Sequence, residues 1–109
     1  MPWLVRDEDV LAVAEVADSR RRRARGLIGR EDVEGAFLIR PCRHVHTFGM
    51  RFPIDIAFCD RSGTVLHMSC LAPKRMSRPV WHSAFAIEAR AGSFERWKLR
   101  AGDVVEIKG

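Results

Sequence analysis

The sequence predicts a single-domain, mainly β fold: an antiparallel jelly-roll-like sandwich or squashed barrel with one short helix across it. Its 109 residues are enough for one hydrophobic core and too few for two, so residues 1–109 are expected to form one domain. Short apolar runs recur, with turn-forming residues between them at intervals of about eight to twelve residues. Hydrophobic residues make up 47% and charged residues 30%, which is typical of a globular rather than a disordered chain.

The clearest strand prediction is the segment from Phe52 to Asp60. Its residues alternate with a period of two, which places successive side chains on opposite faces of a sheet. One face would carry Phe52, Ile54, Ile56 and Phe58, and the other Pro53, Asp55, Ala57 and Cys59. The segment 60–63 ends in glycine and predicts a hairpin turn into a partner strand at 64–71. That strand is expected to alternate too, with Leu66, Met68 and Cys70 on one face and Val65, His67 and Ser69 on the other.

Weaker patterns predict the remaining elements. Strands are expected at 3–5, 10–17, 36–39, 84–89 and 104–107, with a helical or irregular link at 94–99. A helix is the alternative for 10–17, because alanine and Glu15 favour it. Asp18 and Ser19 offer an N-cap for a helix over 20–27, which Gly26 and Gly29 would end.

The net charge of +5 includes four consecutive arginines, Arg20 to Arg23. Neighbouring positions on a helix point in different directions, so four adjacent arginines do not form one binding face. We favour solvated side chains whose stems pack over the core. The alternative is an acidic or nucleic-acid partner that also contacts the basic loop from Lys74 to Arg78, but no nucleic-acid motif accompanies these residues.

No apolar run approaches the roughly 18 residues of a membrane span. The apolar stretch at 10–17 follows three acidic residues instead of a basic segment, so the sequence does not predict a secretion signal. A cytoplasmic location is therefore expected.

The three cysteines include no closely spaced pair, so the sequence predicts neither a disulfide framework nor a four-cysteine zinc site. Cys59 and Cys70 lie in apolar strand patterns and are expected to be buried thiols. Cys42, His44 and His46 are the best metal candidates, because residues two apart on an extended segment share a face. Such nitrogen and sulfur ligands suit zinc or copper.

Five ordered motifs carry a family resemblance. They are Arg25-Gly26-Leu27-Ile28-Gly29-Arg30, Gly35-Ala36-Phe37, the stretch from His46 to Asp60, Glu88-x3-Gly92, and Gly102-Asp103. Over about residues 10 to 108 the chain resembles the small bacterial and archaeal family called domain of unknown function 192, with Ile28 in place of a methionine and Gly49 in place of a tryptophan. The resemblance implies a mainly β, jelly-roll-like fold and brings no known activity.

A polar group of His46, Arg51, Asp55 and Glu88 is the second candidate site. In a functional role, the two carboxylates would position a polar ligand and Arg51 would bind a carboxylate or phosphate. In a structural role, which we favour, Asp55 would accept hydrogen bonds from backbone amides or from Arg25 or Arg30, because an unpaired buried carboxylate is costly.

No nucleophile elbow, phosphate-binding loop or catalytic triad is present in the sequence. We therefore expect a non-catalytic binding or accessory module whose cleft holds a small polar ligand or a partner's peptide. The expected lining residues are His46, Phe48, Met50, Arg51, Asp55, Trp81, His82 and Glu88. The alternatives are a metal-binding protein or small metal-dependent enzyme that uses Cys42, His44 and His46, and, with less support, a nucleic-acid binder.

Overall fold

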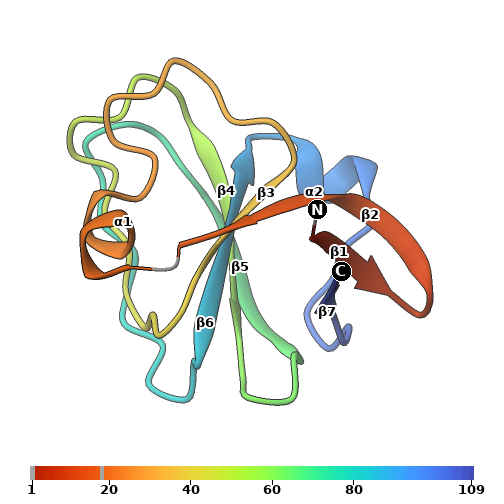
Figure 1. Cartoon of the computed structure of the whole chain (residues 1–109). Helices are drawn as coiled ribbons and strands as arrows, with labels where there is room; N and C mark the ends of the chain where they lie inside the picture. Colours follow the sequence, from red (N-terminus) through yellow and green to blue (C-terminus); the bar gives the residue numbers. More distant parts are fainter. Residues whose placement is uncertain (1, 18) are drawn as a thin grey trace.

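The computed structural model describes residues 2–17 and 19–109, and it confirms the mainly β prediction (Figure 1). The described residues form seven strands and two short helices. The strands are β1 (Trp3–Arg6), β2 (Asp9–Val16), β3 (Ala36–Ile39), β4 (Ile54–Cys59), β5 (Val65–Leu71), β6 (Phe85–Arg90) and β7 (Glu106–Lys108). The helices are α1 (Arg20–Arg25) and α2 (Ser93–Arg96).

The strands form one mixed sheet in the order β5-β4-β6-β3-β2-β1-β7, which does not close into a barrel. Figure 1 shows the long strand β2 joining the central strands to the β1–β7 pair. Every neighbouring pair is antiparallel except β2 and β3, which are parallel. The sequence patterns predicted only antiparallel pairing. The difference arises because α1 and residues 26–35 form a crossover between β2 and β3, and parallel neighbours require such a connection.

The central strands bury both of their faces. One face packs in a cluster that includes Leu38 of β3, Ala57 of β4 and Ile87 of β6. The opposite face packs in a second cluster that includes Ile56 and Phe58 of β4. The alternation predicted for residues 52–60 is therefore confirmed, because side chains one residue apart enter different clusters, and β6 alternates in the same way.

Strand β5 departs from the predicted alternation. Its register with β4 shifts between the pairs Phe58–His67 and Cys59–Val65, so Leu66 is an extra residue in the ladder. As a result, Val65 and Met68 both pack on the first cluster, although the sequence pattern placed them on opposite faces. Cys70 is exposed and not buried as expected, because β5 is an edge strand.

Helix α1 begins and ends close to where the sequence predicts. The Ser19 side chain accepts a hydrogen bond from the backbone N–H of Arg22 at 3.2 Å, as the N-cap prediction requires, while Asp18 lies outside the described residues. The helix ends at Arg25 because Gly26 has a φ of +54°, and the Gly26 N–H donates to the Arg22 carbonyl oxygen at 2.9 Å. No helix in the described part of the chain has the length and apolar character needed to cross a membrane.

Candidate functional site

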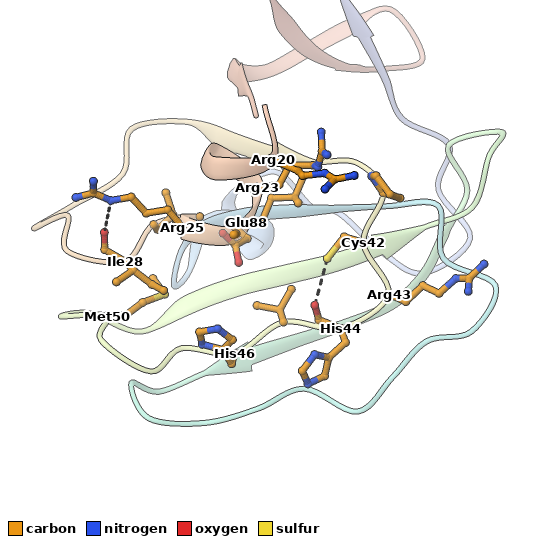
Figure 2. Close-up of a pocket in the computed structure, with 16 residues that line it drawn as sticks. Arg20, Arg23, Arg25, Ile28, Cys42, Arg43, His44, His46, Met50 and Glu88 are labelled. Atoms are coloured by element: carbon orange, nitrogen blue, oxygen red, sulfur yellow. Dashed lines mark hydrogen bonds between the residues drawn. The ribbon is translucent and has the colours of Figure 1, made fainter. Parts of the chain in front are cut away.

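A cleft of about 580 Å³ lies between α1 with its following loop and the segment that leads from β3 toward β4 (Figure 2). Sixteen residues line it: Arg20, Arg23, Ala24, Arg25, Gly26, Leu27, Ile28, Ile39, Pro41, Cys42, Arg43, His44, Val45, His46, Met50 and Glu88. The volume is within the range of small-molecule sites, which is about 300 to 1,000 Å³.

Glu88 is the one carboxylate among the lining residues, and it comes from the centre of the sheet. It sits on β6 opposite Ile56 of β4 and Phe37 of β3, so two strands fix its backbone. The residue is only 2% exposed, and its Oε1 atom has no hydrogen-bond partner among the described residues. Burial raises the pKa of Glu88 to about 7, because the charged form is poorly solvated there. The carboxyl group therefore exchanges a proton near neutral pH.

Gly26 keeps the space beside this carboxyl group open. A Cβ atom at this position would lie 3.6 Å from Oε1 of Glu88 and 3.8 Å from Cδ1 of Ile39. The positive φ also disfavours other residues. The same glycine that ends α1 therefore leaves the wall of the cleft without a side chain next to Glu88.

Four arginines between β2 and β3 form two pairs with different surroundings. Arg22 and Arg30 both pair with Glu15 of β2, and these contacts, led by the hydrogen bonds from Arg30, hold the pKa of Glu15 below its usual value. The side chains of Arg20 and Arg23 line the cleft and have no hydrogen-bond or ion-pair partner within residues 2–17 and 19–109. Figure 2 shows both of them above Glu88.

Two further arginines of the lining turn away from the cavity. Figure 2 shows that the side chain of Arg25 extends past Ile28, and its Nε donates to the Ile28 carbonyl oxygen at 3.2 Å. Arg43 points outward on the opposite side. The cations placed over the cavity are therefore Arg20 and Arg23.

The opposite wall carries Cys42, His44 and His46. The Cys42 thiol donates to the His44 carbonyl oxygen at 3.3 Å. Burial raises the pKa of Cys42, and the negative charge of Glu88 raises it further. The His46 ring stacks on Phe48 with 5.4 Å between ring centroids, and its Nδ1 accepts from the Phe48 N–H at 3.3 Å.

These three side chains do not converge on a common point. Within the described part of the chain, no group of three or more histidine, cysteine, aspartate or glutamate residues is placed to hold a metal ion. Figure 2 shows the reason, because the His44 ring points away from Cys42 and His46.

The structure brings together three of the eight residues predicted for the ligand cleft, His46, Met50 and Glu88, and adds Cys42 and His44 from the predicted metal set. The other five lie elsewhere. Arg51 is exposed, and its Nη1 atom lies 3.6 Å from Oε1 of Glu31. Phe48 is also exposed and stacks on His46. Trp81 and His82 line a separate open hollow, which shares Cys42 and Arg43 with the cleft.

Asp55 lies on the face of the sheet opposite Glu88, because it pairs with Ala89 while the next residue of β4 pairs with Glu88. Its Oδ2 accepts hydrogen bonds from the backbone N–H groups of Gly92 and Phe94, both at 3.0 Å. Asp55 therefore anchors the start of α2 to β4. It has the backbone-amide partners that the structural alternative named, and neither Arg25 nor Arg30 contacts it.

Sequence reasoning did not place Arg20, Arg23 and Gly26 in the site. The arginine run was interpreted as solvated, and Gly26 only as a helix stop. The available signal was the position of Gly26, since it is the second residue of the Arg25–Arg30 motif and follows the arginine run by three residues.

Fold and site together define a small, mainly β, single-sheet protein with a cleft over an unpartnered buried carboxyl group. The chain belongs to the domain of unknown function 192 family, described as uncharacterized ACR, whose sequence model matches residues 4–107. A relative from Pyrococcus abyssi (strain GE5 / Orsay), a UPF0127 protein, is 31% identical over 97 residues, which cover 84% of this chain and 83% of that protein.

Two solved structures share the fold. A protein of unknown function from Novosphingobium aromaticivorans DSM 12444 aligns with a TM-score of 0.79 and 17% identity over 96% of this chain and 82% of its own. A protein from Sinorhizobium meliloti 1021, named as a candidate transcription regulator, aligns with a TM-score of 0.77 and 22% identity over 96% and 90% of the two chains.

Proposed function

We propose that this protein is a non-catalytic binding module and that the cleft between α1 and residues 41–46 holds a small polar ligand. The observation that carries the proposal is the Oε1 atom of Glu88, which is buried at the cleft and has no partner among the described residues. Buried polar groups are almost always hydrogen-bonded, so an exception requires an explanation. A bound molecule with a hydrogen-bond donor supplies one.

The contrast with Asp55 supports a ligand in preference to a structural role for Glu88. Asp55 is also buried, and two backbone amides satisfy it. The Oε1 atom of Glu88 has no donor among the described residues, although Glu88 lies on a strand paired on both sides. A carboxylate kept only for stability is expected to resemble Asp55, since an unsatisfied buried acceptor costs free energy.

A ligand screen on the full chain tests this function. A library of small amines, carboxylates, phosphates and polar neutral compounds would be added to the protein, and binding would be followed by thermal shift and by amide chemical shifts in NMR spectra. Compounds that bind in the cleft are expected to perturb the amides of α1, residues 41–46 and Glu88. A library that produces no such perturbation would contradict the proposal.

Cys42→Phe places a larger side chain in the cleft, and Cys70→Phe makes the same change on the exposed edge strand. We expect the first substitution to abolish binding of any compound found in the screen and the second to preserve it. Equal binding by both variants would show that the compound occupies another site.

The two alternative functions have less support. The metal alternative predicts a chelator-sensitive mass beyond the polypeptide in native mass spectrometry of freshly purified protein. The nucleic-acid alternative draws on Arg20 and Arg23, on the basic loop at 74–78 and on the name of the Sinorhizobium relative. It predicts binding to DNA or RNA that weakens steeply with salt, because phosphate contacts release counterions.

A further inference from the structure

We propose that the ligand of this cleft is a small zwitterion, with an ammonium group that binds Glu88 and a carboxylate or phosphate that binds Arg20 and Arg23. This inference rests on the proposed function, since it assigns the chemical class of the molecule that occupies the cleft. Two independent features of the lining carry it, one at the base of the cavity and one at its rim.

At the base, an ammonium group is the partner that best matches Glu88. The carboxyl group is 2% exposed, so its charge is poorly solvated, and its Oε1 lacks a donor. A neutral hydroxyl group would supply one hydrogen bond and leave the charge of the ionised carboxylate unbalanced. An ammonium group supplies up to three N–H donors and the opposite charge, and buried charges are tolerated when they are paired and hydrogen-bonded.

At the rim, Arg20 and Arg23 offer positive charge to an anion. Glu15 of β2 does not use them, since it binds Arg22 and Arg30. Glu88 is not their anionic partner either, because no ion pair joins it to an arginine in the described part of the chain. Two guanidinium groups on the lining of one cavity offer a site for a carboxylate or phosphate, to which an arginine can donate two parallel hydrogen bonds.

The lining also includes apolar side chains, among them Leu27, Ile39 and Val45. A molecule with an anion at one end, a short methylene chain and an ammonium group at the other would match this combination of charged and apolar surfaces. The volume of about 580 Å³ leaves room for such a chain.

The test uses a series of ω-amino acids on the full-length protein: β-alanine, 4-aminobutyrate and 6-aminohexanoate, with O-phosphoethanolamine as the phosphate-bearing member. Hexanoate and hexylamine are the matched controls, since each lacks one charged end. Isothermal titration calorimetry would give the dissociation constants. At least one zwitterion is expected to bind ten-fold or more tightly than both single-charge controls. Whether this is an amino acid or O-phosphoethanolamine distinguishes a carboxylate from a phosphate at the rim.

Substitutions in the cleft show which residues bind the ammonium group and which bind the anionic group. Glu88→Gln is expected to remove the preference for the zwitterion over hexanoate, and Arg23→Gln to weaken both about equally. Arg21→Gln removes the same charge from an exposed position of α1 that does not line the cleft, and it is expected to bind like the unmodified protein. This control separates a local contact from the general effect of charge.

Three results would overturn the zwitterion. Equal affinity for hexanoate and 6-aminohexanoate would show an anion site that does not use Glu88, and equal affinity for hexylamine would show a cation site that does not use the arginines. Either result would leave the binding function intact. Failure of every member of the series to bind would also exclude the zwitterion, while the broader ligand screen decides separately whether the cleft binds another polar molecule.

Discussion

Two buried carboxylates lie on opposite faces of the same sheet and have opposite surroundings. Asp55 accepts two backbone hydrogen bonds, whereas the Oε1 atom of Glu88 has no partner in the described part of the chain. The first arrangement stabilises the folded state and the second destabilises it whenever the carboxyl group is ionised. At the residue scale, substitutions at these two positions should therefore change stability in opposite directions.

Glu88→Gln is expected to raise stability at high pH and to remove a pH dependence. The folded pKa of about 7 exceeds the usual value of 4.5, so between these values the folded state binds more protons than the unfolded state. Stability should fall as the pH rises from about 4.5 through 7. The interval corresponds to about 3 kcal/mol, at about 1.4 kcal/mol per pH unit.

Urea unfolding at pH 5 and pH 8 gives the free energy of unfolding of Glu88→Gln and of the unmodified protein. The difference between the two proteins at each pH isolates the effect of Glu88, because the contributions of other titratable groups cancel. The charged and titratable groups around Glu88 are Arg20, Arg23, His46 and the Cys42 thiol. Their presence makes the paired comparison necessary. A difference in stability that is the same at both pH values would contradict the raised pKa of Glu88.

Asp55→Ala is expected to lower the melting temperature, because it leaves the amides of Gly92 and Phe94 without their acceptor. An unsatisfied buried donor costs about 1 to 3 kcal/mol, and each kcal/mol corresponds to about 4 to 8 °C in a domain of this size. Asp55→Asn keeps one carbonyl acceptor and should lose less. Thermal denaturation followed by circular dichroism measures both, and an unchanged melting temperature for Asp55→Ala would rule out an anchoring role.

At the scale of elements, Thr47 joins two loops beside the cleft. Its hydroxyl group donates to the Ala72 carbonyl oxygen at 2.6 Å and accepts from the Arg75 N–H at 2.8 Å. The side chain is fully buried, so neither bond is replaced by water. These contacts tie residues 42–50, which form one wall of the cleft, to the basic loop that follows β5.

Thr47→Val is expected to destabilise the protein by about 1 to 3 kcal/mol. The substitution keeps the shape of the side chain but leaves the Ala72 carbonyl oxygen and the Arg75 N–H without their hydrogen-bond partner. Thr47→Ser retains the hydroxyl group and should cost less, so the pair separates the hydrogen bonds from the packing. Amide hydrogen exchange would locate the effect. Faster exchange at the Arg75 amide in the valine variant is expected. Unchanged protection of that amide would show that the Thr47 hydroxyl group does not hold the two loops together.

The elements with the strongest two-residue period were the ones that the sequence could predict. In β4 and β6 both faces are buried by well-defined clusters, and the alternation of large apolar residues carries that information. The parallel pairing of β2 and β3 could not be predicted in the same way, because it depends on the path of residues 17–35 and not on a local pattern. The bulge at Leu66 and the exposure of Cys70 likewise depend on the edge position of β5.

The residues of the cleft that the sequence predicted are likewise the ones that lie in local patterns. Glu88, His46 and Met50 belong to a strand and to a motif-rich segment, so their sequence context pointed to them. Arg20 and Arg23 line the cleft from α1, which the ion pairs of Glu15 with Arg22 and Arg30 tie to β2. No periodicity of the arginine run contains that information.

At the scale of the whole molecule, the two ends of the chain share one core. Strand β1 pairs with β7, with Leu4 opposite Ile107, and the buried side chains of Leu4 and Val105 lie in the same cluster as Ala57 and Ile87 of the central strands. Unfolding of the β1–β7 edge should therefore be coupled to unfolding of the centre.

Leu4→Ala is expected to cost about 2 to 5 kcal/mol, as for a fully buried leucine, and to leave a single cooperative unfolding transition. Val10→Ala provides the comparison, because Val10 is exposed. Thermal unfolding followed by far-ultraviolet and near-ultraviolet circular dichroism measures both. Two separate transitions in the leucine variant would show that the β1–β7 edge melts independently.

The pairing of Trp3 with Lys108 also has a consequence for how the protein is made. During translation, β1 leaves the ribosome before β7, its outer neighbour in the sheet, which lies about a hundred residues later in the chain. Until β7 is available, β1 presents an unpaired row of backbone N–H and C=O groups, the kind of sheet edge that recruits foreign strands. The interval between the synthesis of β1 and that of β7 is therefore the period in which this edge can pair with other chains.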